Sequence, residues 1–182
     1  MRIEVAQEHE IDIVLRVIEE LLAELGEEGQ EFSRVDREKL RVDIRRNLGT
    51  EPGSQSGSAR FLALLAKDDS GAVIGVLTLS QSFAVYAGGE YGVIDEMFVR
   101  PAYRRQGIGR RLVDEAVAIA QQRGWFRLDV TGPEDGGRRA SRFYEKLGFE
   151  FTGPKLRLLV RSYSDGHKES IRLRSTSPDR EV

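Results

Sequence analysis

The chain has 182 residues, and its 28 Lys+Arg against 30 Asp+Glu give a formal net charge of -2, which suits one soluble domain with a substantial hydrophobic core. The absence of cysteine excludes disulfides, thiolate zinc sites, iron–sulfur clusters and a cysteine nucleophile. No apolar run is long enough to span a membrane and no signal-peptide pattern opens the sequence, so we expect a cytoplasmic protein without membrane contact.

The first part of the chain predicts a strand followed by two helices. A short strand is expected at 2–5, and apolar side chains at helical spacing predict a helix over 11–25, with Gly26 as its stop. A second helix is expected at 36–48. The stretch 49–58, rich in Gly, Ser and Pro, is interpreted as a connection inside one domain.

Three consecutive strands follow and are expected to pair antiparallel. The apolar run 61–66 and the run 73–79 read as a hairpin joined by the turn at 68–71. A third strand is expected at 91–99. Pro101 ends it, because proline cannot donate to a strand ladder and restricts the residue before it.

The remaining elements alternate between helix and strand. A strongly amphipathic helix is predicted at 107–123, then a strand at 126–130 and a helix at 138–147. Two short strands are expected at 149–152 and 155–160.

This order of elements predicts an α/β protein with one central mixed sheet. We expect a single domain over 1–160. Residues 161–182 are polar, with Pro178 near the end, and are interpreted as a loosely held C-terminal tail.

The small net charge conceals two oppositely charged parts of the sequence. Residues 1–99 carry 10 basic and 19 acidic side chains, a net of -9, whereas residues 100–182 carry 18 basic and 11 acidic, a net of +7. The asymmetry predicts two surfaces with different ligands, although uneven charge on solvated helix faces would give the same totals.

The segment with the clearest chemistry is a strand, a short loop and the start of a helix that contains Gly107 and Gly109. Amide N–H groups at a helix N-terminus are unsatisfied and carry a partial positive charge, so they favour an anion such as a pyrophosphate. Four arginines surround this point: Arg104, Arg105, Arg110 and Arg111. A Walker loop is absent, and Leu112 occupies the position where a dinucleotide fingerprint needs its third glycine.

Two blocks at a fixed spacing extend this observation. Residues 104–109 read Arg-Arg-Gln-Gly-Ile-Gly, and residues 140–149 read Ala-Ser-Arg-Phe-Tyr-Glu-Lys-Leu-Gly-Phe. They resemble the [RQ]-x-x-G-x-[GA] and A-x-x-F-Y-x-x-x-G-F blocks of the GNAT superfamily of acyl-CoA-dependent N-acetyltransferases, and 96–101 is similar to that family's central strand. The resemblance is close over about 91–152, and by the order of elements it extends over about 1–160.

The resemblance implies a GNAT-like sheet that is largely antiparallel, has two splayed parallel strands and is flanked by helices. Acetyl-CoA is then expected between the strands that end near Val99 and Val130, with its pantetheine arm paired to the strand edge and its pyrophosphate on the helix start. The residues implied to contact it are Met97, Phe98, Val99, Arg104, Arg105, Gln106, Gly107, Ile108, Gly109, Arg110 and Phe143. One position departs from the family, because Gly137 stands where an Asn that contacts the pantetheine arm is often found.

The implied chemistry is direct attack of an amine on the thioester. A primary alkylamine has a pKa near about 10.4, so a base must remove its proton at neutral pH. Glu96 and Asp95 are the candidates, with Glu96 preferred, and they cannot both face the substrate unless a bulge interrupts the strand. By resemblance, the Tyr144 hydroxyl protonates the departing thiolate and the amide near Met97 polarises the thioester carbonyl. A carboxylate held by an arginine and a tyrosine used only for packing are the structural alternatives.

Other classes of function have less support in the sequence. There is no nucleophile motif, His9 and His167 are expected to face solvent without binding metal, and the helix 107–123 lacks the features of a nucleic-acid reader. The main rival is an acyl-CoA-binding sensor or interaction domain without catalysis. The enzyme is favoured because the candidate base and acid are all present.

The expected acceptor is a cationic primary amine: a small amine, an aminoglycoside-like polyamine or a protein amino terminus. The acidic residues of 1–99, including both N-terminal helices and the segment 82–90, are expected to form the acceptor side and attract the ammonium group. Members of the family are often dimers, so a homodimer is expected. No metal cofactor and no nucleic-acid partner are expected.

Overall fold

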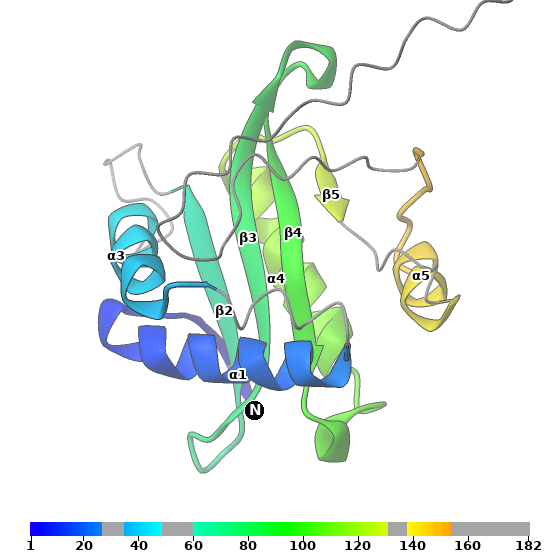
Figure 1. Ribbon diagram of the computed structural model, residues 1–182. Coiled ribbons are helices and arrows are strands. Elements are labelled where there is room, and N and C mark those ends of the chain that lie inside the picture. Colours follow the sequence, from blue (N-terminus) through cyan, green and yellow to red (C-terminus); the bar gives the residue numbers. More distant parts are fainter. Residues whose placement is uncertain (27–34, 49–59, 131–137, 154–182) are drawn as a thin grey trace, which may run out of the picture. The chain divides into compact units, whose positions relative to one another are not determined.

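The computed structural model describes residues 1–26, 35–48, 60–130 and 138–153 (Figure 1). A five-stranded sheet in the order β1-β2-β3-β4-β5 forms its centre. The strands are β1 (Arg2–Val5), β2 (Phe61–Lys67), β3 (Val73–Ala84), β4 (Gly89–Val99) and β5 (Leu128–Val130). The first four pair antiparallel, and β5 pairs parallel with β4, so the expected mixed α/β sheet is confirmed.

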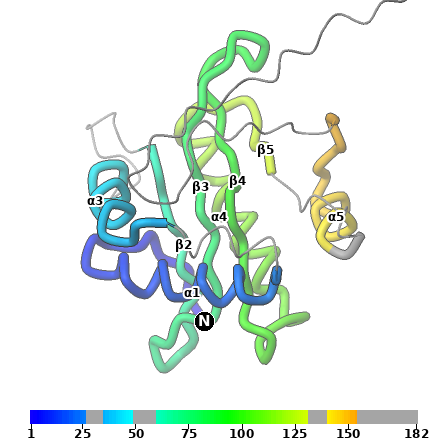
Figure 2. The backbone as a smooth tube through the Cα atoms, viewed as in Figure 1, coloured from blue at the N-terminus to red at the C-terminus, as the bar shows by residue number. Residues whose placement is uncertain are grey.

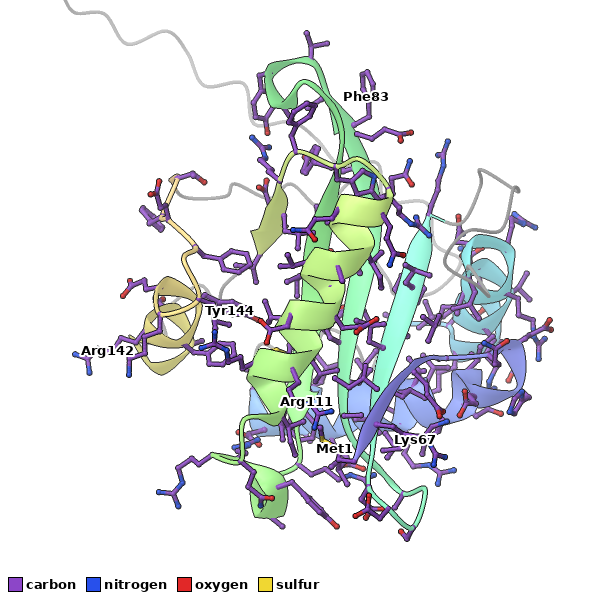
Figure 3. All side chains as sticks on the ribbon, turned by 180° about the vertical axis from the view of Figure 1, so that it is seen from behind. Met1, Lys67, Phe83, Arg111, Arg142 and Tyr144 are labelled. Carbon is purple, nitrogen blue, oxygen red and sulfur yellow. The ribbon has the colours of Figure 1, made fainter. Side chains whose placement is uncertain are left out.

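Helices cover both faces of this sheet. The helices α1 (Ile11–Glu24) and α3 (Arg37–Asn47) lie on one face, and α4 (Ile108–Gln122) lies along the other (Figures 1 and 3). The helix α5 (Arg138–Glu145) follows β5 in the chain. Short 3₁₀ turns complete the elements: η1 (Glu8–Glu10), η3 (Val85–Ala87) and η4 (Pro101–Tyr103). None of the helices in the described ranges is both long and apolar enough to cross a membrane.

The sheet separates two apolar clusters because successive side chains along a strand point to opposite faces. Leu77 and Ile94 belong to the cluster packed by α4, together with Leu112 of that helix. Val76 and Phe98 belong to the cluster packed by α1. The faces of the sheet between the two helix layers are therefore buried, and a ligand reaches the sheet backbone there at a strand edge.

Most predicted elements agree with the structure, but their bounds differ. The strand expected at 73–79 continues to Ala84, and the one expected at 91–99 begins at Gly89. The resulting hairpin extends beyond the rest of the sheet (Figure 2). Its tip exposes large apolar side chains, namely Phe83, Val85 and Tyr86.

The strand predicted at 149–152 is wrong, because the described residues there have no regular pairing. The amide of Phe149 donates to the Tyr144 carbonyl at 3.1 Å and so closes the end of α5. The preceding Gly148 has φ +91, the left-handed conformation that often ends a helix. All elements named above lie in one compact unit, Met1–Glu150. The strand predicted at 155–160, the domain boundary at 160 and the tail 161–182 lie outside the described residues.

Gly92 allows close packing at the start of the β4–β5 pair. A Cβ atom there would lie 2.4 Å from Leu128 Cδ2 and 2.6 Å from Trp125 Cζ3. We expect Gly92→Ala to lower the free energy of unfolding by about 1–3 kcal/mol, because those side chains must move out of a filled core. Urea unfolding measures the change. The control Glu90→Ala alters an exposed side chain of the same strand and should stay within about 0.5 kcal/mol of the parent; equal values for the two variants would contradict this packing.

Candidate active site

A β-bulge interrupts β4 where the sequence places the two candidate bases. The register with β3 shifts between Leu77 and Leu79, so Asp95 and Glu96 together lie opposite the single residue Thr78. An extra residue of this kind bends a strand and redirects its side chains, and bulges are common beside active sites. Because the bulge interrupts the alternation of side chains, the carboxylates of Asp95 and Glu96 can both face the same side of the sheet.

The carboxylate of Glu96 is held by Thr78. The Thr78 hydroxyl donates a hydrogen bond to Glu96 Oε2, and it accepts one from the backbone amide of Glu96 at 3.0 Å. Burial raises the pKa of Glu96 above its ordinary value; the hydrogen bond from Thr78 opposes this rise, and the negative charge of Asp95 adds to it. Asp95 itself is exposed. A half-buried carboxyl group with a raised pKa is a better proton acceptor near neutral pH than an ordinary glutamate.

The edge of β4 is open beyond the bulge. β5 pairs with β4 only over Gly92–Ile94. Among the described residues, no strand accompanies the following stretch, 95–99, on the β5 side. The described pairing of the two parallel strands ends with Ile94 and Val130, the last residue of β5; the splay that the resemblance implies stays a prediction.

The open edge presents the backbone of Met97 and Val99. The Arg100 amide donates to the Ile74 carbonyl of β3 at 3.0 Å. Since alternate residues of an antiparallel strand direct their backbone groups toward and away from the partner strand, Met97 and Val99 direct theirs away from β3. The Val99 carbonyl accepts a hydrogen bond from Arg104 Nε at 2.7 Å, and the amide groups of both residues face the open side.

Two of the residues predicted to contact the cofactor have buried side chains. Phe98 lies in the α1-side cluster, and its backbone faces β3, so the structure does not bring it to the open edge. Ile108 packs in the α4-side cluster. Its contribution to a ligand is limited to its backbone amide in the first turn of α4.

The start of α4 has the backbone of an anion site. Gly107 is the N-cap residue and has φ +79, a conformation that favours glycine. A Cβ atom on Gly109 would lie 3.3 Å from the Phe143 ring and 3.8 Å from Met97 Cε, so the absence of a side chain lets these two residues pack closely against the start of α4. Arg105 has φ 62 and is exposed, and the Gln106 side chain donates to the Ala102 carbonyl at 3.3 Å.

The arginines expected to surround the site differ in their contacts. Arg104 makes a bidentate ion pair with Glu24 of α1, with bonds of 2.8 and 2.6 Å, and lies over the Phe98 ring. Its guanidinium therefore anchors the loop between β4 and α4 to α1. Only the backbone of Arg104 is left to contact a ligand at the start of α4. Arg110 is exposed and has a weak contact of 3.7 Å with Asp114, so it remains suited to meet a phosphate.

The tyrosine of the second block reaches the same strand residue. Tyr144 belongs to α5 (labelled in Figure 3). Its Oη lies 4.0 Å from Met97 Sδ, and its ring packs edge-on against Phe143 and Phe149. Burial raises the pKa of Tyr144 to about 12, so the hydroxyl stays protonated at neutral pH. The two sequence blocks therefore meet at Met97, between the start of α4 and α5.

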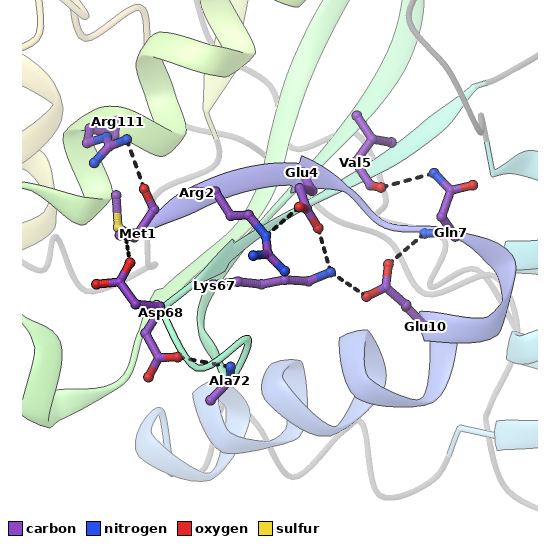
Figure 4. A network of polar contacts seen from close by, with 11 residues as sticks. Met1, Arg2, Glu4, Val5, Gln7, Glu10, Lys67, Asp68, Ala72 and Arg111 are labelled. Atoms are coloured by element: carbon purple, nitrogen blue, oxygen red, sulfur yellow. Dashed lines mark hydrogen bonds and ion pairs between the residues drawn. The ribbon is translucent and has the colours of Figure 1, made fainter.

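The predicted acidic acceptor surface is largely neutralised on α1. Four of its carboxylates form ion pairs with arginines: Asp12 with Arg41, Glu19 with Arg37, Glu20 with Arg100 and Glu24 with Arg104. Near β1, Glu4 and Glu10 both bind Lys67 at 2.7 Å (Figure 4). These carboxylates are therefore paired with cations of the protein itself, and the acceptor side expected on 1–99 stays a prediction. Asp95 and Glu96 lie at the bulge of β4, next to the open edge.

Sequence reasoning missed Thr78 and the pairs that anchor the loop. A signal for Thr78 was its place as a polar residue inside an apolar strand. A signal for the anchors was the matching spacing of Glu20 and Glu24 with Arg100 and Arg104, four residues apart on each side.

The remaining predictions concern metal binding, the two histidines and Gly137. The described ranges hold no group of three His, Asp or Glu side chains placed to bind a metal ion. His9 is exposed, as expected. His167 and the departing position Gly137 lie outside the described residues.

Comparisons with known proteins give one family. Residues 18–149 match the model of the acetyltransferase (GNAT) family. A glucosamine 6-phosphate N-acetyltransferase of Trypanosoma brucei brucei is 27% identical over 157 residues, covering 81% of this chain and 96% of that protein. A thialysine N-epsilon-acetyltransferase of Bos taurus is 27% identical over 143 residues, covering 79% and 80%. An aminoglycoside acetyltransferase from an uncultured soil metagenomic sample shares the fold, with a TM-score of 0.65 at 20% identity over 88% of this chain and 96% of that chain.

Proposed function

We propose that this chain, which belongs to the acetyltransferase (GNAT) family and is an acetyl-CoA-dependent acetyltransferase, moves the acetyl group directly to a cationic primary amine. The observation that carries the proposal is the position of Glu96 at the bulge of β4, beside an open strand edge whose next residue, Met97, contacts Tyr144. Two relatives are named for N-acetylation, of glucosamine 6-phosphate and of thialysine, which supports an amine as the acceptor.

Acetyl-CoA is bound along β4 and at the start of α4. The amide groups of Met97 and Val99 pair with the pantetheine arm as a further strand would. The pyrophosphate meets the amides of Gly107 to Arg110, where the helix carries its partial positive charge. Neither Gly107 nor Gly109 carries a side chain that would keep an anion away from these amides.

Glu96 is the general base. It takes a proton from the ammonium group of the acceptor, directly or through water, and the free amine attacks the thioester carbon. The Met97 amide stabilises the negative charge that develops on the carbonyl oxygen. As the new C–N bond forms and the C–S bond breaks, the Tyr144 hydroxyl gives its proton to the thiolate. The nitrogen then releases its second proton, which returns through solvent to the Tyr144 oxygen and leaves a neutral amide; the proton on Glu96 is released to solvent.

The cationic character of the acceptor is supported by the bulge and not by α1. Asp95 and Glu96 place two carboxylates at the bulge, next to the open edge of β4. These carboxylates would attract any cationic amine equally, whether it is a small amine, an aminoglycoside-like polyamine or a protein amino terminus. The expected homodimer and cytoplasmic location stay predictions.

Binding of acetyl-CoA and transfer from it are tested in two steps. We expect acetyl-CoA to raise the melting temperature, because a ligand at 100 times its Kd stabilises the native state by about 2.7 kcal/mol. No stabilisation at millimolar acetyl-CoA would contradict the proposed binding site. Release of free thiol is then followed with a panel of amines. Binding without release for any amine would favour the alternative, an acyl-CoA-binding sensor.

A further inference from the structure

Thr78 occupies an unusual position in the sheet. Among the described residues it is the one polar side chain in the fully buried core, and its neighbours Leu77 and Leu79 are apolar. A buried hydroxyl destabilises a protein unless its hydrogen bonds are made. Both hydrogen bonds of Thr78 are made with one residue, Glu96. The threonine and the bulge therefore form a single local arrangement.

The geometry fixes the direction of the Thr78 hydroxyl proton. The amide of Glu96 is held by the strand and donates to Oγ1 at 3.0 Å. Because that amide already uses an oxygen lone pair, the hydroxyl hydrogen points to another acceptor, which is Glu96 Oε2. Threonine is branched at Cβ and stiff at χ1, so the hydroxyl is a well-fixed donor. One oxygen of the carboxylate is thereby occupied and Oε1 is left for another partner.

We propose that Thr78 is a positioning residue for acetyl transfer: it holds Glu96 by Oε2, so that Oε1 is the oxygen that takes the proton of the acceptor amine. The inference rests on the proposed function, in which Glu96 is the base. A hydrogen bond to the ionised carboxylate also favours the ionised form over the protonated one. Thr78 itself touches neither substrate and acts through Glu96.

Few other groups influence the charge of Glu96. On its own strand, Asp95 opposes ionisation. From α5, Tyr144 lies beside Met97 and stays neutral at physiological pH. The side of α1 that packs against the sheet is apolar, and no lysine or arginine in the described ranges forms an ion pair with Glu96. Thr78 is therefore the group that counteracts the burial of this carboxylate.

The test compares Thr78→Val, which keeps the shape and removes the hydroxyl, with Thr78→Ser, which keeps the hydroxyl. In Thr78→Val we expect kcat to fall about tenfold or more, and the acid limb of the kcat/KM profile to move about one pH unit upward, because the pKa of Glu96 rises when its donor is lost. The KM for acetyl-CoA should stay within about twofold. Thr78→Ser should keep the position of the acid limb. If Thr78→Val does not fold, Thr78→Ala makes the same comparison.

Coupling to Glu96 separates positioning from a general effect on the fold. In a Glu96→Gln background, Thr78→Val should cause no further loss of kcat/KM. An additive loss, or an unchanged acid limb in Thr78→Val while Glu96→Gln is inactive, would overturn this inference and leave the proposed function intact. Full activity of Glu96→Gln would overturn the assignment of Glu96 as the base and this inference with it; absence of transfer to any amine in the parent enzyme would overturn the proposed function itself.

Discussion

Replacing Glu96 by glutamine should lower kcat by about 10²–10⁴-fold, the usual contribution of a general base. The amide keeps the size of the side chain but cannot accept the proton of an ammonium group. Binding of acetyl-CoA should be nearly unchanged, because the open edge of β4 presents the backbone of Met97 and Val99 and does not involve the Glu96 side chain. Steady-state kinetics with thermal-shift titration of acetyl-CoA measures both quantities.

The pH dependence gives a second readout of the same substitution. The ionised carboxylate is the active form, so kcat/KM in the parent enzyme rises as the pH passes the pKa of Glu96. Burial raises that pKa above the ordinary value of 4.5, and the acid limb should therefore lie above the range of an exposed glutamate. The limb should disappear in Glu96→Gln.

The matched control is Asp95→Asn, which removes a neighbouring carboxylate from the same bulge. It should retain most of kcat. Loss of the negative charge that raises the pKa of Glu96 should shift the acid limb slightly downward. If Asp95→Asn abolishes turnover while Glu96→Gln retains it, the assignment of the base is reversed.

Replacing Tyr144 by phenylalanine should lower kcat by about 100-fold at neutral pH, the lower end of the range for general acid catalysis. The hydroxyl is the group removed, and its pKa of about 12 means that it carries its proton under these conditions. The ring contacts with Phe143 and Phe149 are kept, so acetyl-CoA affinity should change little.

The deficit of Tyr144→Phe should shrink above about pH 8.5, where a typical thiol ionises on its own and needs no proton donor. Tyr86→Phe is the control, because it removes the same atom from an exposed tyrosine at the tip of the β3–β4 hairpin. Equal losses of turnover and of acetyl-CoA affinity in Tyr144→Phe would indicate that the tyrosine only packs.

The sequence predicted the parts of the site that depend on local pattern. The glycines at 107 and 109 stand at the beginning of a strongly amphipathic pattern, and this periodicity was enough to place them at the start of α4. The block that contains Tyr144 was likewise recognisable from its own residues. Both depend on neighbours within a few positions of the chain.

The parts that could not be predicted depend on contacts between distant residues. The bulge exists only relative to β3, and the Thr78–Glu96 hydrogen bonds join residues 18 positions apart. The ion pair of Arg104 with Glu24 spans 80 positions. The strand expected at 149–152 failed for a related reason, since the Phe149 amide closes α5. Pairing partners and competing hydrogen bonds are tertiary properties that periodicity does not contain.

The bulge also changes the phase of the β4 backbone. Before the bulge, the Gly92 amide donates to the Arg127 carbonyl at 3.1 Å. The backbone groups of the even-numbered residues therefore point toward β5. In an uninterrupted strand the even-numbered residues would continue to face β5 and the odd-numbered residues to face β3. The Met97 amide would then donate its hydrogen bond to β3. The extra residue turns the odd-numbered positions outward instead. On the side of β5, β4 therefore directs the backbone groups of its even-numbered residues to β5 before the bulge, and those of its odd-numbered residues to the open edge after it.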